Sequence, residues 1–111
     1  MRTTFSTAVL GIAVAGFVMV APAADAATVT PVKIIDFAFT PALVTIAHGT
    51  AVRWTNRSAF TRHSVTRTSG AWTLDRTLLT GASVTQTFPK PGTYSYHCRF
   101  HSVMVGKVVV K

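Results

Sequence analysis

The chain of 111 residues has one cysteine, Cys98, which excludes an internal disulfide bond. Acidic residues are also few: three, against eleven lysines and arginines, which gives a formal net charge of +8. The arginines are scattered along the chain, and the basic runs typical of nucleic-acid binding are missing. We therefore expect no nucleic-acid partner. The positive charge favours an acidic protein or an anionic surface, which it would attract most strongly at low salt.

Residues 1–26 have the composition of a secretory signal. An arginine stands near the start, residues 9–20 are almost wholly apolar, and Ala24-Asp25-Ala26 provides a small-x-small cleavage site. A membrane anchor is the alternative, but glycine, proline and hydroxyl residues interrupt the apolar stretch, and an anchor needs about 20 apolar residues. We expect cleavage after residue 26, export to the periplasm or the medium, no stable membrane anchor, and a monomeric mature domain covering residues 27–111.

The expected mature chain of 85 residues is long enough for one compact domain and too short for two. Short segments rich in β-branched and aromatic residues alternate with turn residues, and no convincing amphipathic helix occurs. This pattern predicts an all-β fold, an antiparallel β-sandwich. The expected strands cover residues 32–39, 43–47, 51–56, 63–66, 83–88, 93–98 and 106–110, and residues 68–81 are expected to be loop with at most one short strand.

The last hairpin contains the residues with metal-binding chemistry. Because successive side chains of a strand point to opposite faces, Tyr94, Tyr96 and Cys98 share one face. Two tyrosines on that face predict that it packs inward, with the thiol at the edge of the core. His97 then points away from the core, and we do not expect it to be a ligand.

Cys98, His101 and Met104 follow one another at intervals of three in a predicted turn, and His63 stands alone upstream. One thiolate, two imidazoles and one thioether are the ligand set of a mononuclear blue-copper site. Taken singly, a buried cysteine or methionine is usually a core residue. The combination favours a metal, and the methionine favours copper over zinc. A bound ion would also protect the lone thiol in an oxidising compartment.

With these residues the chain resembles the cupredoxins, and within their plastocyanin-like group it is most similar to the amicyanins, which have the same short His-x2-Met spacing. The resemblance implies a Greek-key β-sandwich with one type 1 copper ion that alternates between Cu(I) and Cu(II). His63, Cys98 and His101 would be the equatorial ligands and Met104 the axial one. It also implies an exported carrier of single electrons between larger redox partners. The matching motifs are Phe37-Ala38-Phe39-x-Pro41, Gly49-Thr50-x-Val52-x-Trp54-x-Asn56, His63-x-Val65 and Gly92-Thr93-Tyr94-Ser95-Tyr96-His97-Cys98-x-x-His101-x-x-Met104-x-Gly106-Lys107-Val108-Val109-Val110.

The sequence departs from the family at two positions near the predicted ligands. Ser64 stands where the family usually has an asparagine that braces the ligand loop, and Arg99-Phe100 stands where it usually has a proline. The shorter serine and the missing proline predict a looser loop, a shifted reduction potential or a more open site.

The family also presents its C-terminal histidine ligand through an apolar patch where partners dock. By resemblance, Phe60, Phe100 and Val103 would form this patch, with Arg62 and Arg99 at its rim. The alternative places Phe60 and Val103 in the core.

Other functions remain as alternatives to electron transfer. An enzyme is not expected, because the chain has no His-x-His pair, and two aspartates outside the leader do not make a Ser/His/Asp set. A copper carrier or storage protein of the exported compartment usually has Met-rich or His-rich segments, which are missing here. A cupredoxin fold used only as an interaction module would not need the ligands.

Overall fold

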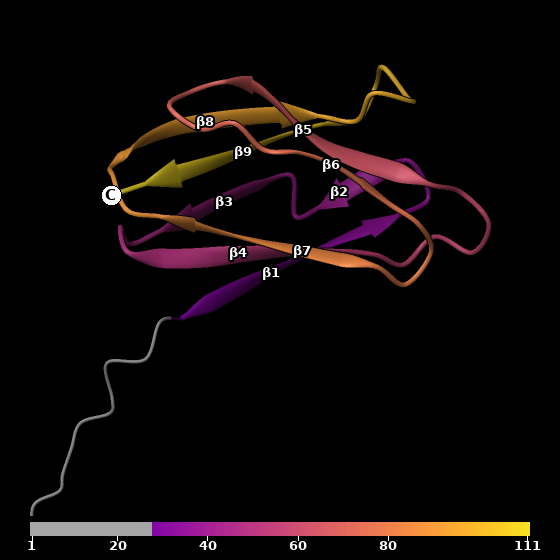
Figure 1. Ribbon diagram of the computed structural model, residues 1–111, viewed down its shortest axis with the longest axis horizontal. Coiled ribbons are helices and arrows are strands. Elements are labelled where there is room, and N and C mark those ends of the chain that lie inside the picture. Colours follow the sequence, from indigo (N-terminus) through magenta and orange to yellow (C-terminus); the bar gives the residue numbers. More distant parts are fainter. Residues whose placement is uncertain (1–27) are drawn as a thin grey trace, which may run out of the picture.

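The computed structural model describes residues 28–111, and the predicted leader lies outside these residues. Within residues 28–111, nine strands form two sheets that pack face to face (Figure 1). In the same range, no helix is long and apolar enough to cross a membrane. The two packed sheets confirm the predicted β-sandwich. The strands are β1 (Val29–Ile35), β2 (Ala38–Thr40), β3 (Leu43–Ile46), β4 (Thr50–Asn56), β5 (His63–Ser69), β6 (Asp75–Leu78), β7 (Ser83–Phe88), β8 (Gly92–His97) and β9 (Val105–Val110).

The two sheets are mixed, so the prediction of a purely antiparallel sandwich is wrong. One sheet has the order β2-β1-β4-β7 and the other the order β3-β9-β8-β5-β6. The pairs β1–β4 and β3–β9 are parallel, and the other pairs are antiparallel. The chain moves to the second sheet for β3 and returns for β4, so β1 and β4 meet as neighbours running in one direction. Alternation within a strand shows which residues face inward and leaves the direction of the neighbouring strand open.

The expected strand over residues 32–39 is two strands, β1 and β2, which pair antiparallel across a tight turn. Asp36 in this turn has a positive φ of 56°. Aspartate tolerates this left-handed conformation better than most residues, but neither glycine nor proline marks the turn in the sequence. The other expected strands agree with the structure to within a few residues, and the irregular stretch 68–81 contains the short strand β6.

The core between the sheets fixes strand β8, which leads to Cys98. Tyr94, Tyr96 and Cys98 are 4%, 1% and 2% exposed, which confirms that they share the inward face. The Tyr96 ring packs edge-on against Phe39 at 4.7 Å and Trp54 at 5.3 Å between ring centroids. This burial raises the pKa of Tyr96 to about 12. This packing anchors Tyr96 in the core, and with it the strand that leads to the thiol.

Candidate metal centre

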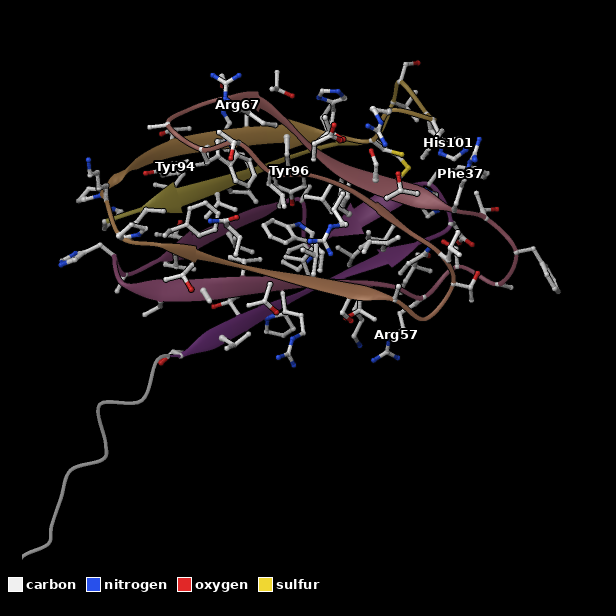
Figure 2. All side chains as sticks on the ribbon, in the orientation of Figure 1. Phe37, Arg57, Arg67, Tyr94, Tyr96 and His101 are labelled. Atoms are coloured by element: carbon white, nitrogen blue, oxygen red, sulfur yellow. The ribbon has the colours of Figure 1, made fainter. Side chains whose placement is uncertain are left out.

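His63, Cys98 and His101 come together at the end of the sandwich away from the C-terminus, where Figure 2 shows His101 beside Phe37. Their three ligand atoms lie within 4.8 Å of one another. The Cys98 Sγ atom is 3.9 Å from His63 Nδ1 and 3.7 Å from His101 Nδ1. Bond lengths of about 2.3 Å to sulfur and about 2.0 Å to nitrogen, at roughly 110–120°, put the two ligand atoms about 3.5–3.7 Å apart. The two sulfur–nitrogen distances are therefore close to those expected when a metal ion lies between Cys98 and each histidine.

The loop from β8 to β9 contains Cys98, His101 and Met104 and is closed by its own backbone. The Cys98 amide donates to the Met104 carbonyl at 3.1 Å, and the Met104 amide donates to the His101 carbonyl at 3.0 Å. Met104 is 1% exposed, so its side chain lies inside the molecule. The intervals of three residues thus match a compact turn between two strands that is closed by two backbone hydrogen bonds.

His63 begins β5 and is completely buried. Its Nε2 lies 2.9 Å from the Ser58 hydroxyl, which leaves Nδ1 facing the Cys98 sulfur. Ser58 is held in turn, because its amide donates to the Asn56 side chain at 2.9 Å. A partner of this kind on the second ring nitrogen usually orients a metal-binding histidine. Ser58 could not be identified from the sequence, because a lone serine in a loop belongs to no recognisable pattern.

The pKa of His63 lies below its ordinary value of 6.5. Burial is the main cause, and the nearby His101 adds to it, whereas the Asp36 carbonyl acts in the opposite direction. Neutral imidazole is the form that binds a metal. The site therefore keeps His63 ready for coordination over a wider pH range than an exposed histidine would allow.

Two backbone amides surround the Cys98 sulfur. The amides of Ser64 and Phe100 each donate to Sγ at 3.4 Å, and their dipoles would stabilise negative charge on the sulfur. The Ser64 hydroxyl also reaches the ligand loop, because it accepts a hydrogen bond from the Arg99 amide at 2.8 Å. The serine side chain, although shorter than asparagine, therefore still contacts the ligand loop. His97 points away, as predicted, and contacts Thr68.

The surface around His101 is mainly apolar and includes basic side chains. Phe60 is 99% exposed and Val103 is 76% exposed, which excludes the alternative that both are core residues. Phe37, 55% exposed, packs edge-on against the His101 ring at 4.9 Å (Figure 2). The Arg62 guanidinium lies 4.2 Å from the centre of the Phe100 ring. Beside His101 is an open groove of about 740 Å³, lined by Phe60, Thr61, Arg62, Leu79, Thr80, Phe100 and His101.

Known proteins share this fold and much of this sequence. The chain matches the family described as cupredoxin-like domain over residues 8–110. Amicyanin-alpha of Methylorubrum extorquens is 38% identical over 86 residues, which cover 74% of this chain and 71% of that protein. Among solved structures, a reduced proline-to-phenylalanine variant of amicyanin has a TM-score of 0.68 at 32% identity, covering 78% and 84% of the two chains. A purple cupredoxin from Nitrosopumilus maritimus has a TM-score of 0.67 at 25% identity, covering 74% of this chain and 99% of that one.

Cupredoxins are electron carriers that hold one copper ion, and a thiol with two imidazoles at the observed spacing suits that ion. Sequence, fold and donor set lead to the same family. The chain belongs to the cupredoxins.

Proposed function

We propose that this chain is an exported type 1 copper protein that transfers single electrons between redox partners. His63, Cys98 and His101 would be the equatorial ligands and Met104 the axial ligand. The observation that supports this most directly is the approach of both Nδ1 atoms to the buried Cys98 sulfur, at 3.9 and 3.7 Å. The buried methionine three residues after His101 supplies the remaining group that such a site uses.

Bound copper would supply a one-electron couple between Cu(I) and Cu(II). The protein contributes by holding its ligands still and keeping water away from them. Ser58 orients His63, and the backbone bonds between Cys98 and Met104 close the ligand loop. Because these groups are already fixed, few atoms have to move when the charge of the site changes. A small reorganisation is what favours rapid electron exchange.

Electron exchange would take place at the surface around His101, since His63, Cys98 and Met104 are buried and His101 is half-buried. The exposed Phe60 and Val103 would contact the partner, and the net charge of +8 would attract an acidic one. We place the mature protein in the periplasm or the medium as a monomer, in line with the leader-like residues 1–26.

The absorption and paramagnetic spectra of the copper-loaded protein test the proposed site. We expect a strong band near the red end of the visible range, from charge transfer between thiolate and copper. Cys98→Ser should abolish this band, whereas Met104→Leu should keep the copper and raise the reduction potential. A colourless Cu(II) protein would rule out a type 1 site, and an unchanged potential in Met104→Leu would rule out the axial role.

Salt dependence tests the proposed partner and separates electron transfer from copper storage. Electron exchange with an acidic redox protein should slow as ionic strength rises. At a given ionic strength, Phe60→Ser should slow electron exchange with the partner. It should leave the spectrum and the stability unchanged, because this side chain is 99% exposed. Rates that do not respond to salt would contradict electrostatic docking. A reduced protein that passes no electrons to any partner but releases copper to a chelator would favour storage.

A further inference from the structure

Four polar side chains form a block on the outer face of β5 and β6, beside the metal centre. Ser64 pairs with Thr77 across the two strands, and Thr66 pairs with Asp75, so all four side chains lie on one face. The Ser64 and Thr66 hydroxyls are 2.8 Å apart, and the Thr66 hydroxyl donates to the Asp75 carboxylate at 3.0 Å. A continuous set of contacts thus connects Ser64 to Asp75.

Arg99 lies across this block and closes it into a ring. Its backbone amide donates to the Ser64 hydroxyl at 2.8 Å. Its guanidinium donates from Nη1 to both Asp75 carboxylate oxygens, at 2.7 and 2.9 Å, and from Nη2 to the Thr77 hydroxyl at 2.7 Å. Starting at the Arg99 backbone, the contacts pass through Ser64, Thr66 and Asp75 and return to the Arg99 side chain.

The ring adjoins the sulfur of Cys98 on two sides. Arg99 follows Cys98 directly and precedes Phe100, whose amide is one of the two donors to the sulfur. Ser64, whose amide is the other donor, is a member of the ring. A shift of Arg99 would therefore move the adjoining Cys98 and Phe100, and would change the position of the sulfur relative to both amides. Because the ion pair is 41% and 50% exposed, we expect it to add little to global stability, so its effect should be local.

We propose that Asp75 is a positioning residue of the metal centre. Acting through Arg99 and Thr66, its carboxylate keeps the ligand loop closed over Cys98 and keeps both amides directed at the sulfur. The family usually has a proline at this position of the ligand loop. In this chain the ion pair between Asp75 and Arg99 restrains the loop there instead. The role of the sulfur in binding copper rests on the proposed function, but the closure of the loop does not.

The thiol of the copper-free protein provides the first test. Cys98 is 2% exposed, so alkylation by iodoacetamide reports opening of the loop. Asp75→Asn should speed alkylation about fivefold, equivalent to about 1 kcal/mol of lost loop closure, with a smaller change in the free energy of global unfolding. Asp75→Glu, which keeps the carboxylate, should recover most of the protection. Arg99→Gln should match Asp75→Asn, and the double variant should be no faster than either, because both changes break the same ring.

Arg76→Gln is the matched control for Arg99→Gln. Arg76 lies on β6 between Asp75 and Thr77, and within residues 28–111 its side chain makes no hydrogen bond or ion pair. Its alkylation rate should stay at the level of the unmodified protein. The proposal is overturned if Asp75→Asn changes the rate by less than about twofold. It is also overturned if Arg76→Gln accelerates the reaction equally, or if the acceleration is fully explained by global unfolding.

The copper-loaded protein provides the second test. Asp75→Asn should shift the thiolate-to-copper band and the reduction potential, because the distances from the sulfur to the two amides change, and Arg76→Gln should shift neither. An unchanged band and potential in Asp75→Asn would contradict the positioning role. If the unmodified copper protein lacks the band, the proposed function fails, and the alkylation rates alone then decide whether Asp75 closes the loop.

Discussion

Gly106→Ala tests the packing that holds the strand before Cys98. Gly106 lies opposite Tyr96 in the β8–β9 pair, and the Tyr96 ring fills the space where a side chain would stand. An added Cβ would lie 2.3 Å from Tyr96 Cζ, 2.4 Å from its hydroxyl oxygen and 2.6 Å from Cε2. Carbon atoms in contact are usually about 3.5–4.0 Å apart, so the overlap exceeds 1 Å by this measure. Tyr96 has little room to move, since Phe39 and Trp54 pack against it.

The expected loss of stability follows from these distances. Replacing glycine by alanine in a strand would otherwise stabilise by roughly 0.5–1 kcal/mol, whereas forcing an extra carbon into a packed core costs about 1–3 kcal/mol or more. We expect Gly106→Ala to lower the free energy of unfolding by about 2 kcal/mol, a change of roughly 30-fold in the folding equilibrium. Denaturant unfolding of the copper-free protein, followed by tryptophan fluorescence, measures this change.

A double-mutant cycle with Tyr96→Leu separates this clash from a general intolerance of alanine in β9. A leucine side chain ends before the positions of the Cζ and hydroxyl atoms, so the overlap disappears. In the Tyr96→Leu background, Gly106→Ala should therefore be neutral or stabilising. A cost below about 0.5 kcal/mol for Gly106→Ala alone, or an equal cost in both backgrounds, would show that the clash with Tyr96 does not limit stability.

Two further predictions concern His63. Ser58→Ala removes the hydroxyl at its Nε2 and should lower copper affinity about 10–100-fold in competition with a chelator, whereas Ser83→Ala, which removes an exposed hydroxyl bonded to Thr55, should leave the affinity unchanged. Because the folded-state pKa of His63 lies below 6.5, the unfolded chain binds more protons in this range, so the copper-free protein should lose stability as the pH falls from 6.5 through the lower folded pKa. Denaturant midpoints at several pH values measure the loss, and an equal slope in His63→Gln would show that another group is responsible.

The ligand loop could be predicted from the sequence because its information is local. Cys98, His101 and Met104 lie within seven residues of one another, and the alternation of Tyr94, Tyr96 and Cys98 shows which way the thiol faces. The strands also follow from local patterns. His63 lies 35 residues before Cys98 in the sequence, and the pairing of β5 with β8 brings it to this loop. Its residue type indicated that it could be a ligand, but no local pattern showed that it would lie there.

The groups that support the ligands could not be predicted in the same way. Ser58 and Asp75 lie in stretches without a periodic pattern, and each acts through a partner that is near in space and not in sequence. The contact between the Ser64 hydroxyl and the Arg99 amide could not be predicted either, because the position of that amide depends on how β5 and β8 pair. The parallel pairing of β1 with β4 was missed for the same reason, since it depends on how the chain crosses between the sheets.

The burial of His63 and Cys98 beneath a half-buried His101 has a consequence for how a metal ion reaches the site. Because His101 is the half-buried member of the set, an ion that enters the folded apoprotein would meet the site beside His101 and Phe37, whose ring lies against the imidazole. A metallochaperone would need to approach this same edge. Metal loading and the binding of a redox partner would then use the same small surface. An apoprotein already bound to a redox partner would therefore take up the metal slowly.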